Sequence, residues 1–328
     1  MECTDDCLSI IDENQEFPDG TALPHFQRRH PMQVPLSILI YRRVIARPDP
    51  LFPDVIHAHR FAQHLHLLRR WFHVLPLEQA VRRLKERSLP SRAAAITFDG
   101  GYADHAEVAL PLLQRFGLPA TFFVATGYLD GGYSWSDAVI ELVRNAPGPR
   151  LNLARSGFGA YDVACLVRRR AVIDMLLAAL GTLPPVERLE RVHAMARRTT
   201  PTMLSSDQVI ALHRAGMAIG GHTVNQHSLA TLSNAEARAE IGNGRARLEE
   251  IVQAPVRLFA YPNGRPGADF EKRHANMLRS AGFDAAVTTA SGAARASCDP
   301  YELPRFTPCE RSSGAFLLRM GSNLLRAA

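Results

Sequence analysis

The sequence predicts an α/β fold: a deformed (β/α) barrel with a helical insertion. Two observations support this prediction. From about residue 34, short apolar runs typical of buried strands alternate with longer runs whose apolar residues recur at helical spacing, the pattern of βα units around a parallel sheet. The number of these units favours a barrel over an open sheet, so functional side chains are expected at the carboxyl ends of the strands.

Strands are expected where short apolar and β-branched runs occur. They are 36–41 (LSILIY), 93–98 (AAAITF), 120–126 (ATFFVAT), 217–222 (MAIGGH), 256–261 (VRLFAY) and 284–289 (DAAVTT). Helices are expected between them, at 57–72, 103–117, 205–216, 233–252 and 269–282. Gly117 is placed to end the second of these helices, and Ser205 or Ser206 to cap the third.

The chain divides into three parts by composition. Residues 1–33 are polar and irregular and are interpreted as an N-terminal tail, residues 34–310 as the barrel, and residues 311–328 as a C-terminal tail. Within the barrel, residues from about 133 to 200 contain consecutive helical patterns without strands. This segment is the predicted helical insertion, and packing is the expected role of its apolar residues.

Composition limits the classes of function. The formal charge of +6 comes from arginines that are scattered or mixed with acidic residues, so a nucleic-acid partner is not expected. Five cysteines form no paired framework, which favours a reducing compartment. The start of the chain lacks the pattern of a signal peptide, and no stretch is long and apolar enough for a membrane span, so a cytoplasmic location is expected.

Polar residues gather after three of the predicted strands, in TFDGGYAD, GGHTVNQHSL and FAYPNGRPG. They are Asp99, Tyr102, Asp104, His222, Asn225, Gln226, His227, Tyr261 and Asn263. A carboxylate and histidines at separate strand ends are typical of a hydrolytic metal site, in which a metal-bound water is the nucleophile and a free carboxylate is the base. The sequence therefore indicates a candidate hydrolase site at one end of the barrel.

Several motifs resemble those of the polysaccharide deacetylases of the nodulation-protein (NodB) type, carbohydrate esterase family four, and within it a proteobacterial subgroup found with exopolysaccharide genes. The motifs are LSILIYRRV, ITFDGGYAD, LPATFFVATGYLDGG, SWSD, GGHTVNQHSLATLS, FAYPNG and LPRFTP, spread from about Leu36 to Pro308. The resemblance implies a deformed barrel of that type, with an acetylated amino sugar or polysaccharide as partner and a divalent metal such as zinc as cofactor. The implied reaction is hydrolysis of the N-acetyl group.

The resemblance also implies roles for individual residues. Asp99 takes the place of the general base, and His222 that of the first metal-binding histidine. The backbone N–H of Asn263 takes the place of the oxyanion donor. The implied substrate contacts are Arg42, Tyr102, Asp104, Trp135, Asp137, Tyr261 and Arg305.

This chain departs from the family pattern at three positions. The family motif Thr-Phe-Asp-Asp-Gly places Gly100 where a metal-binding aspartate is expected, and the ungapped second motif places Gln226 at the second histidine. His227 follows one residue later and stays open as a ligand. Arg42 stands where the subgroup has a histidine. If Arg42 reaches the site, its charge favours an anionic sugar such as a uronic or phosphorylated sugar; otherwise it faces solvent or pairs with Asp99 or Glu107.

Three functions follow as alternatives. The first is a carbohydrate N-deacetylase with Asp99 as base and His222, with His227 or Gln226, around a metal. The second is a catalytically inactive relative that needs no metal and binds carbohydrate or a partner protein through the barrel cleft. The third is a basic structural or nucleic-acid-associated protein, against which the motifs argue. Replacing Gly100 by aspartate and Gln226 by histidine is expected to restore metal binding.

Overall fold

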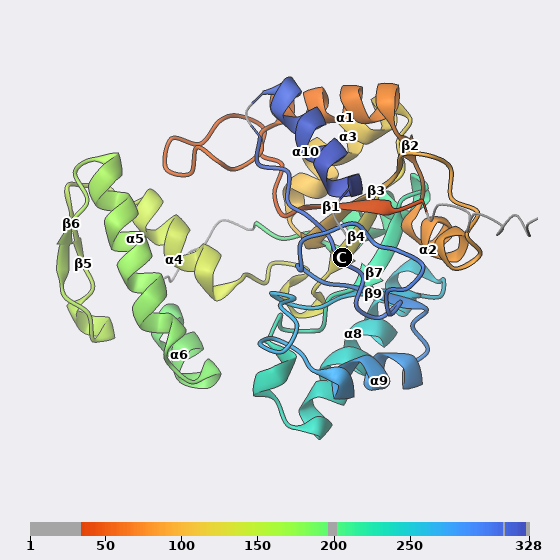
Figure 1. The fold of residues 1–328 in the computed structure, drawn as a ribbon. Coiled ribbons are helices and arrows are strands. Elements are labelled where there is room, and N and C mark those ends of the chain that lie inside the picture. The colour runs from red at the N-terminus through yellow and green to blue at the C-terminus, as the bar shows by residue number, and fades with distance from the viewer. Residues whose placement is uncertain (1–33, 196–201, 311, 326–328) are drawn as a thin grey trace, which may run out of the picture. The chain divides into compact units, whose positions relative to one another are not determined.

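The computed structural model describes residues 34–195, 202–310 and 312–325 (Figure 1). Its central sheet has seven parallel strands in the order β1-β3-β4-β7-β8-β9, with β2 paired to β3. The strands are β1 (Leu36–Tyr41), β2 (His73–Val74), β3 (Ala93–Gly100), β4 (Thr121–Val124), β7 (Ala218–Gly221), β8 (Leu258–Ala260) and β9 (Ala285–Val287). The predicted fold class is confirmed, because the sheet is the strongly curled, parallel half-barrel of a deformed barrel.

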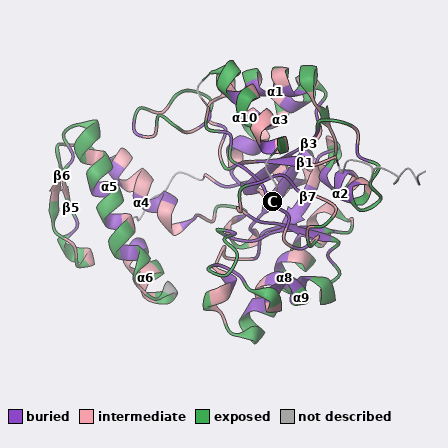
Figure 2. Cartoon of the chain, in the orientation of Figure 1, coloured by how far each residue is buried: buried purple, intermediate pink, exposed green. Residues whose placement is uncertain are grey.

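Helices alternate with these strands. They are α1 (Ala58–Trp71), α2 (Leu77–Lys85), α3 (Leu110–Phe116), α7 (Ser206–Arg214), α8 (Asn234–Val252), α9 (Lys272–Ser280) and α10 (Ser313–Leu325). Single turns also form at η1 (His105–Ala109), η2 (Thr126–Tyr128) and η4 (Leu229–Thr231). Capping boxes at Ser205 and Ser233 start α7 and α8, and Gly117 ends α3 in the left-handed conformation. In Figure 2 the central sheet is mostly buried, and exposed residues lie on the outer faces of the helices.

The two faces of β3 belong to different parts of the core. Ala94, Ile96 and Phe98 pack in the cluster that lies beneath α1, α3 and α8. Ala93 and Ala95 belong to a second cluster, which includes the apolar face of α2. Side chains alternate along a strand, so Thr97 and Asp99 lie on the same face as Ala93 and Ala95, the inner face of the curled sheet.

Residues 294–306 bridge the two edges of the curled sheet. The N–H of Ile40 donates to the carbonyl of Phe306 and the N–H of Phe306 to that of Ile38, at 3.0 and 3.1 Å. Three residues earlier, Leu303 exchanges hydrogen bonds with β9. Because this connection pairs with both edge strands, Arg305 lies directly between β9 and β1.

The predicted insertion is helical but also contains a hairpin. Its described elements are α4 (Trp135–Arg144), β5 (Arg150–Asn152), η3 (Ala154–Ser156), β6 (Ala160–Asp162), α5 (Leu166–Gly181) and α6 (Pro185–Met195). The hairpin was not predicted, because its strands have only three residues each and are mostly exposed. The insertion has its own apolar cluster, which Leu51 from the loop after β1 also joins.

The C-terminal segment differs from the prediction. Residues 313–325, expected as part of a tail, form α10, and its Phe316 and Met320 are fully buried against the core. His64 of α1 stacks on Phe316, with ring centroids 4.2 Å apart. Apolar residues four apart on one helical face were the signal for this helix. The predicted tail 1–33 lies outside the described residues, and none of the described helices has the length and apolar character needed to cross a membrane.

Candidate functional site

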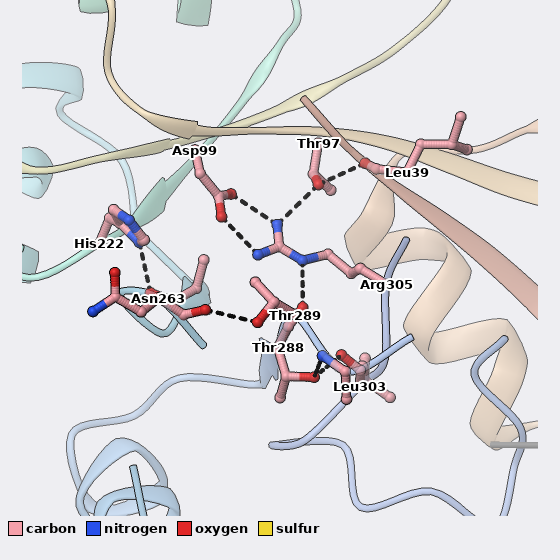
Figure 3. Close-up of polar contacts among 11 residues, drawn as sticks. Leu39, Thr97, Asp99, His222, Asn263, Thr288, Thr289, Leu303 and Arg305 are labelled. Carbon is pink, nitrogen blue, oxygen red and sulfur yellow. Dashed lines mark hydrogen bonds and ion pairs between the residues drawn. The ribbon is translucent and has the colours of Figure 1, made fainter. Parts of the chain in front are cut away.

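Asp99 lies at the carboxyl end of β3, and Arg305 holds both of its carboxylate oxygens. Nη1 of Arg305 donates to Oδ1 of Asp99 at 2.7 Å and Nη2 to Oδ2 at 2.6 Å (Figure 3). The same guanidinium donates to Thr97 Oγ1 at 3.0 Å and to the Thr288 carbonyl at 2.8 Å. Arg305 has no solvent exposure, so the ion pair lies inside the barrel beneath the strand ends.

This ion pair determines the charge of Asp99. Burial alone would raise the pKa of its carboxyl group, but the charge and hydrogen bonds of Arg305 outweigh burial and hold the pKa below its usual value. A planar, bidentate pair also fixes the orientation of the carboxylate. Asp99 is therefore an ionised, immobilised hydrogen-bond acceptor.

His222 follows β7 and is the second group at the strand ends. Its Nδ1 lies 2.8 Å from the carbonyl of Ala260, and because a carbonyl only accepts, Nδ1 carries the hydrogen and Nε2 keeps its lone pair. Burial lowers the pKa of the imidazole, although Asp99 nearby opposes this shift. His222 is therefore a neutral acceptor next to the carboxylate.

Gly100 has a backbone conformation that suits glycine only. Its φ is +105°, and a Cβ added there would lie 2.8 Å from Cε2 of Tyr102 and 3.1 Å from Nε2 of Gln226. The Tyr102 ring thus takes up the space into which a side chain at position 100 would project. An aspartate does not fit this backbone without movement of Tyr102, which argues against restoring a metal site by two substitutions alone.

Tyr102 is itself held from the opposite side. Nε and Nη2 of Arg42 donate to its hydroxyl at 3.2 and 3.0 Å, and burial raises the pKa of the phenol to about 12. Asp137 of α4 lies close enough to act on Arg42 and Tyr102 electrostatically. Arg42 therefore binds neither Asp99 nor Glu107: it anchors the ring that packs against Gly100.

Gln226 and His227 are neighbours in the sequence but interact with different residues. Gln226 has a φ of +53°, and its Nε2 donates to the Gly100 carbonyl at 3.4 Å, so it is the residue beside the site. His227 contributes to the electrostatic field at Glu236, whose pKa is lowered mainly by hydrogen bonds from Ser233 at the start of α8. Among the described residues, His227 does not join Asp99 and His222 in a group that could hold a metal.

The residues at the strand ends do not fit a bound divalent metal. A zinc site of a hydrolase requires three protein ligands and an open position. Gly100 offers no side chain, Gln226 offers an amide turned to a backbone carbonyl, and only His222 supplies an imidazole. Within residues 34–195, 202–310 and 312–325, no three His, Cys, Asp or Glu side chains gather in an arrangement that could hold a metal.

Three other predicted substrate contacts have structural roles. Tyr261 is buried and stacks on Phe270 with ring centroids 3.7 Å apart. Asp104 is buried and accepts hydrogen bonds from Arg43 Nε at 2.7 Å and from the Val44 N–H at 3.1 Å, which ties the end of β1 to η1. Arg305 lies beneath Asp99 rather than at the surface.

Asn263 and Trp135 lie at the edges of the site. Asn263 is exposed, has a φ of +57°, and accepts a hydrogen bond from Thr289 Oγ1 at 2.7 Å. This turn leaves the Asn263 N–H without an acceptor among the described residues. Trp135 begins α4 and packs under the guanidinium of Arg188, 4.9 Å from the ring centroid.

The fold and the position of these groups define a (β/α)-barrel protein with its site at the carboxyl ends of the strands. The family model "Polysaccharide deacetylase" matches residues 86–286, and the chain belongs to that family. Enzymes of the family typically use a divalent metal. Among curated protein sequences, none matches this chain significantly.

Solved structures share the fold. The deacetylase PplD of Streptococcus pyogenes, in complex with acetate, superposes with a TM-score of 0.60 at 19% identity over 88% of this chain and 98% of its own. IcaB from Ammonifex degensii has a TM-score of 0.58 at 20% identity over 89% and 97%. The de-N-acetylase from Aggregatibacter actinomycetemcomitans has a TM-score of 0.56 at 15% identity over 87% and 99%.

Proposed function

We propose that this chain binds an acetylated polysaccharide at the strand ends of the barrel and has lost metal-dependent hydrolysis of the N-acetyl group. Family membership supports the class of ligand, since the chain is a polysaccharide deacetylase homologue along most of its length. The observation that carries the loss of hydrolysis is the packing of Tyr102 and Gln226 against Gly100. The resemblance to the family motif implies a metal-binding aspartate at this position.

The groups that stay in place suit binding. Asp99 is an ionised acceptor, Nε2 of His222 is a neutral acceptor, and Arg42 is an exposed donor. Sugar hydroxyls both donate and accept, so they match this mixture of groups. A nucleic-acid partner has no such support, because the arginines named here are directed to Asp99, Tyr102 and Asp104 rather than forming a basic surface.

The test compares binding with hydrolysis. Oligomers of N-acetylglucosamine titrated calorimetrically into the protein are expected to bind, and His222→Gln is expected to weaken binding by about tenfold through loss of one buried hydrogen bond. In the presence of zinc, nickel or cobalt, the wild-type chain should release no more acetate than His222→Gln does. Acetate release by the wild-type chain that His222→Gln abolishes would establish the deacetylase instead.

A further inference from the structure

A cavity next to the strand ends is not explained by the fold. It has a volume of about 680 Å³, within the range of small-molecule sites, and lies between the loop that follows β1 and helix α4 of the insertion. Asp99 and His222 do not line it, but Arg42 and Tyr102 do. Because Arg42 also acts electrostatically on Asp99 and His222, the cavity adjoins the proposed binding site.

The walls of the cavity are mainly apolar. Ile45 and Phe52 come from the loop, Ile140 from α4 and Leu177 from α5. Much of the charge around them is already neutralised. Arg144 pairs with Asp49 at 2.8 Å and with Glu141 at 3.0 Å.

Asp137 is the exception among these groups. Its side chain lines the cavity and is 8% exposed, and its Oδ2 is buried without a hydrogen-bond partner among the described residues. Burial raises the pKa of this carboxyl group, while Arg42, Arg43 and a hydrogen bond with Tyr102 oppose the shift, so Oδ2 is the oxygen that lacks a partner. A buried polar atom without a partner is costly, so a ligand that supplies the missing hydrogen bond gains affinity at this point.

We infer that this cavity binds an uncharged, acetylated sugar residue that continues the chain held at the strand ends. A hydroxyl group serves both Arg42 and Asp137, because it accepts from the guanidinium and either donates to or accepts from the carboxyl group. The methyl of an acetyl group and the C–H faces of the ring suit the apolar walls. The inference rests on the proposed binding function and adds a second subsite, built by the insertion.

The test varies the length of the ligand. A pentamer of N-acetylglucosamine spans both places, whereas a dimer occupies the strand ends alone. Asp137→Ala and Ile140→Trp are each expected to weaken the pentamer by about tenfold and to leave the dimer within twofold. Val167→Trp is the matched control, because Val167 is exposed on α5 and does not line the cavity.

Methyl NMR of the unmutated chain provides an independent readout. The pentamer should shift the methyl signals of Ile45 and Ile140, and the dimer should not; Ile173, buried in the core of the insertion, is the reference. One outcome would contradict the inference alone: the pentamer binds and depends on His222, but both cavity variants bind it normally and the methyl signals of Ile45 and Ile140 do not shift. The cavity is then not a subsite. If neither the pentamer nor the dimer binds, both the proposed function and this inference are wrong.

Discussion

Replacing Arg305 by methionine is expected to lower the free energy of unfolding by about 3–5 kcal/mol. The guanidinium has no solvent exposure and neutralises the carboxylate of Asp99 through two hydrogen bonds. Without it, a buried carboxylate is left unpaired, and Thr97 and the Thr288 carbonyl each lose a donor. Urea unfolding followed by circular dichroism at pH 7 measures the change.

The double variant Asp99→Asn with Arg305→Met is the control for this result. It removes both charges, so it should be more stable than Arg305→Met alone. A loss below about 1 kcal/mol for the single variant would contradict the account, because exposed ion pairs typically contribute no more than that.

The same pair predicts how stability depends on pH. The pKa of Asp99 is lower in the folded than in the unfolded chain. The contribution of the carboxylate is therefore complete above the unfolded-state pKa of about 3.9 and decreases as the pH falls toward the folded-state pKa. The double variant lacks this carboxylate, so its stability should decrease less than that of the wild-type chain between about pH 4 and pH 2. This is roughly the range in which a paired carboxylate takes up its proton.

Replacing Gly100 by aspartate is expected to destabilise the chain by about 3 kcal/mol. Two physical causes add here: a positive φ that L-residues rarely adopt, and a Cβ that overlaps the ring of Tyr102. Gly131→Asp is the matched control, because Gly131 has a similar φ of +99° but no atom within 4 Å of its added Cβ. Thermal unfolding of the two variants separates strain from overlap.

The double variant Gly100→Asp with Gln226→His should consequently bind no zinc. Adding Tyr102→Ala removes the ring that overlaps the new side chain and should recover part of the lost stability. Equal melting temperatures for Gly100→Asp and Gly131→Asp would show that the Tyr102 ring does not obstruct a side chain at position 100.

The repeated βα pattern was enough to predict the sheet, most of its helices and the end of the barrel that carries polar residues. Asp99 and His222 were predicted because both follow apolar strands. The strand β2 and the hairpin β5–β6 were not predicted, since short or exposed segments carry little periodic signal. Helix α2 was missed although its buried residues recur at helical spacing: Leu77, Ala80, Val81 and Leu84.

The contacts of the site depended on packing between distant segments. Arg305 was identified as a polar residue near the site, but its pairing with Asp99 joins positions 206 residues apart. Likewise, the departures at Arg42, Gly100 and Gln226 appeared independent in the sequence. In the structure they are coupled, because Arg42 anchors Tyr102, and Tyr102 and Gln226 both pack against Gly100.

Sugar binding at the strand ends without a metal requires that His222 takes no part in zinc uptake, which a calorimetric zinc titration measures. Zinc also binds to histidines and cysteines elsewhere on proteins, so the wild-type chain is compared with His222→Gln. We expect the same zinc uptake for both proteins. One additional zinc per chain in the wild type, bound at micromolar or lower concentration and lost in His222→Gln, would contradict it.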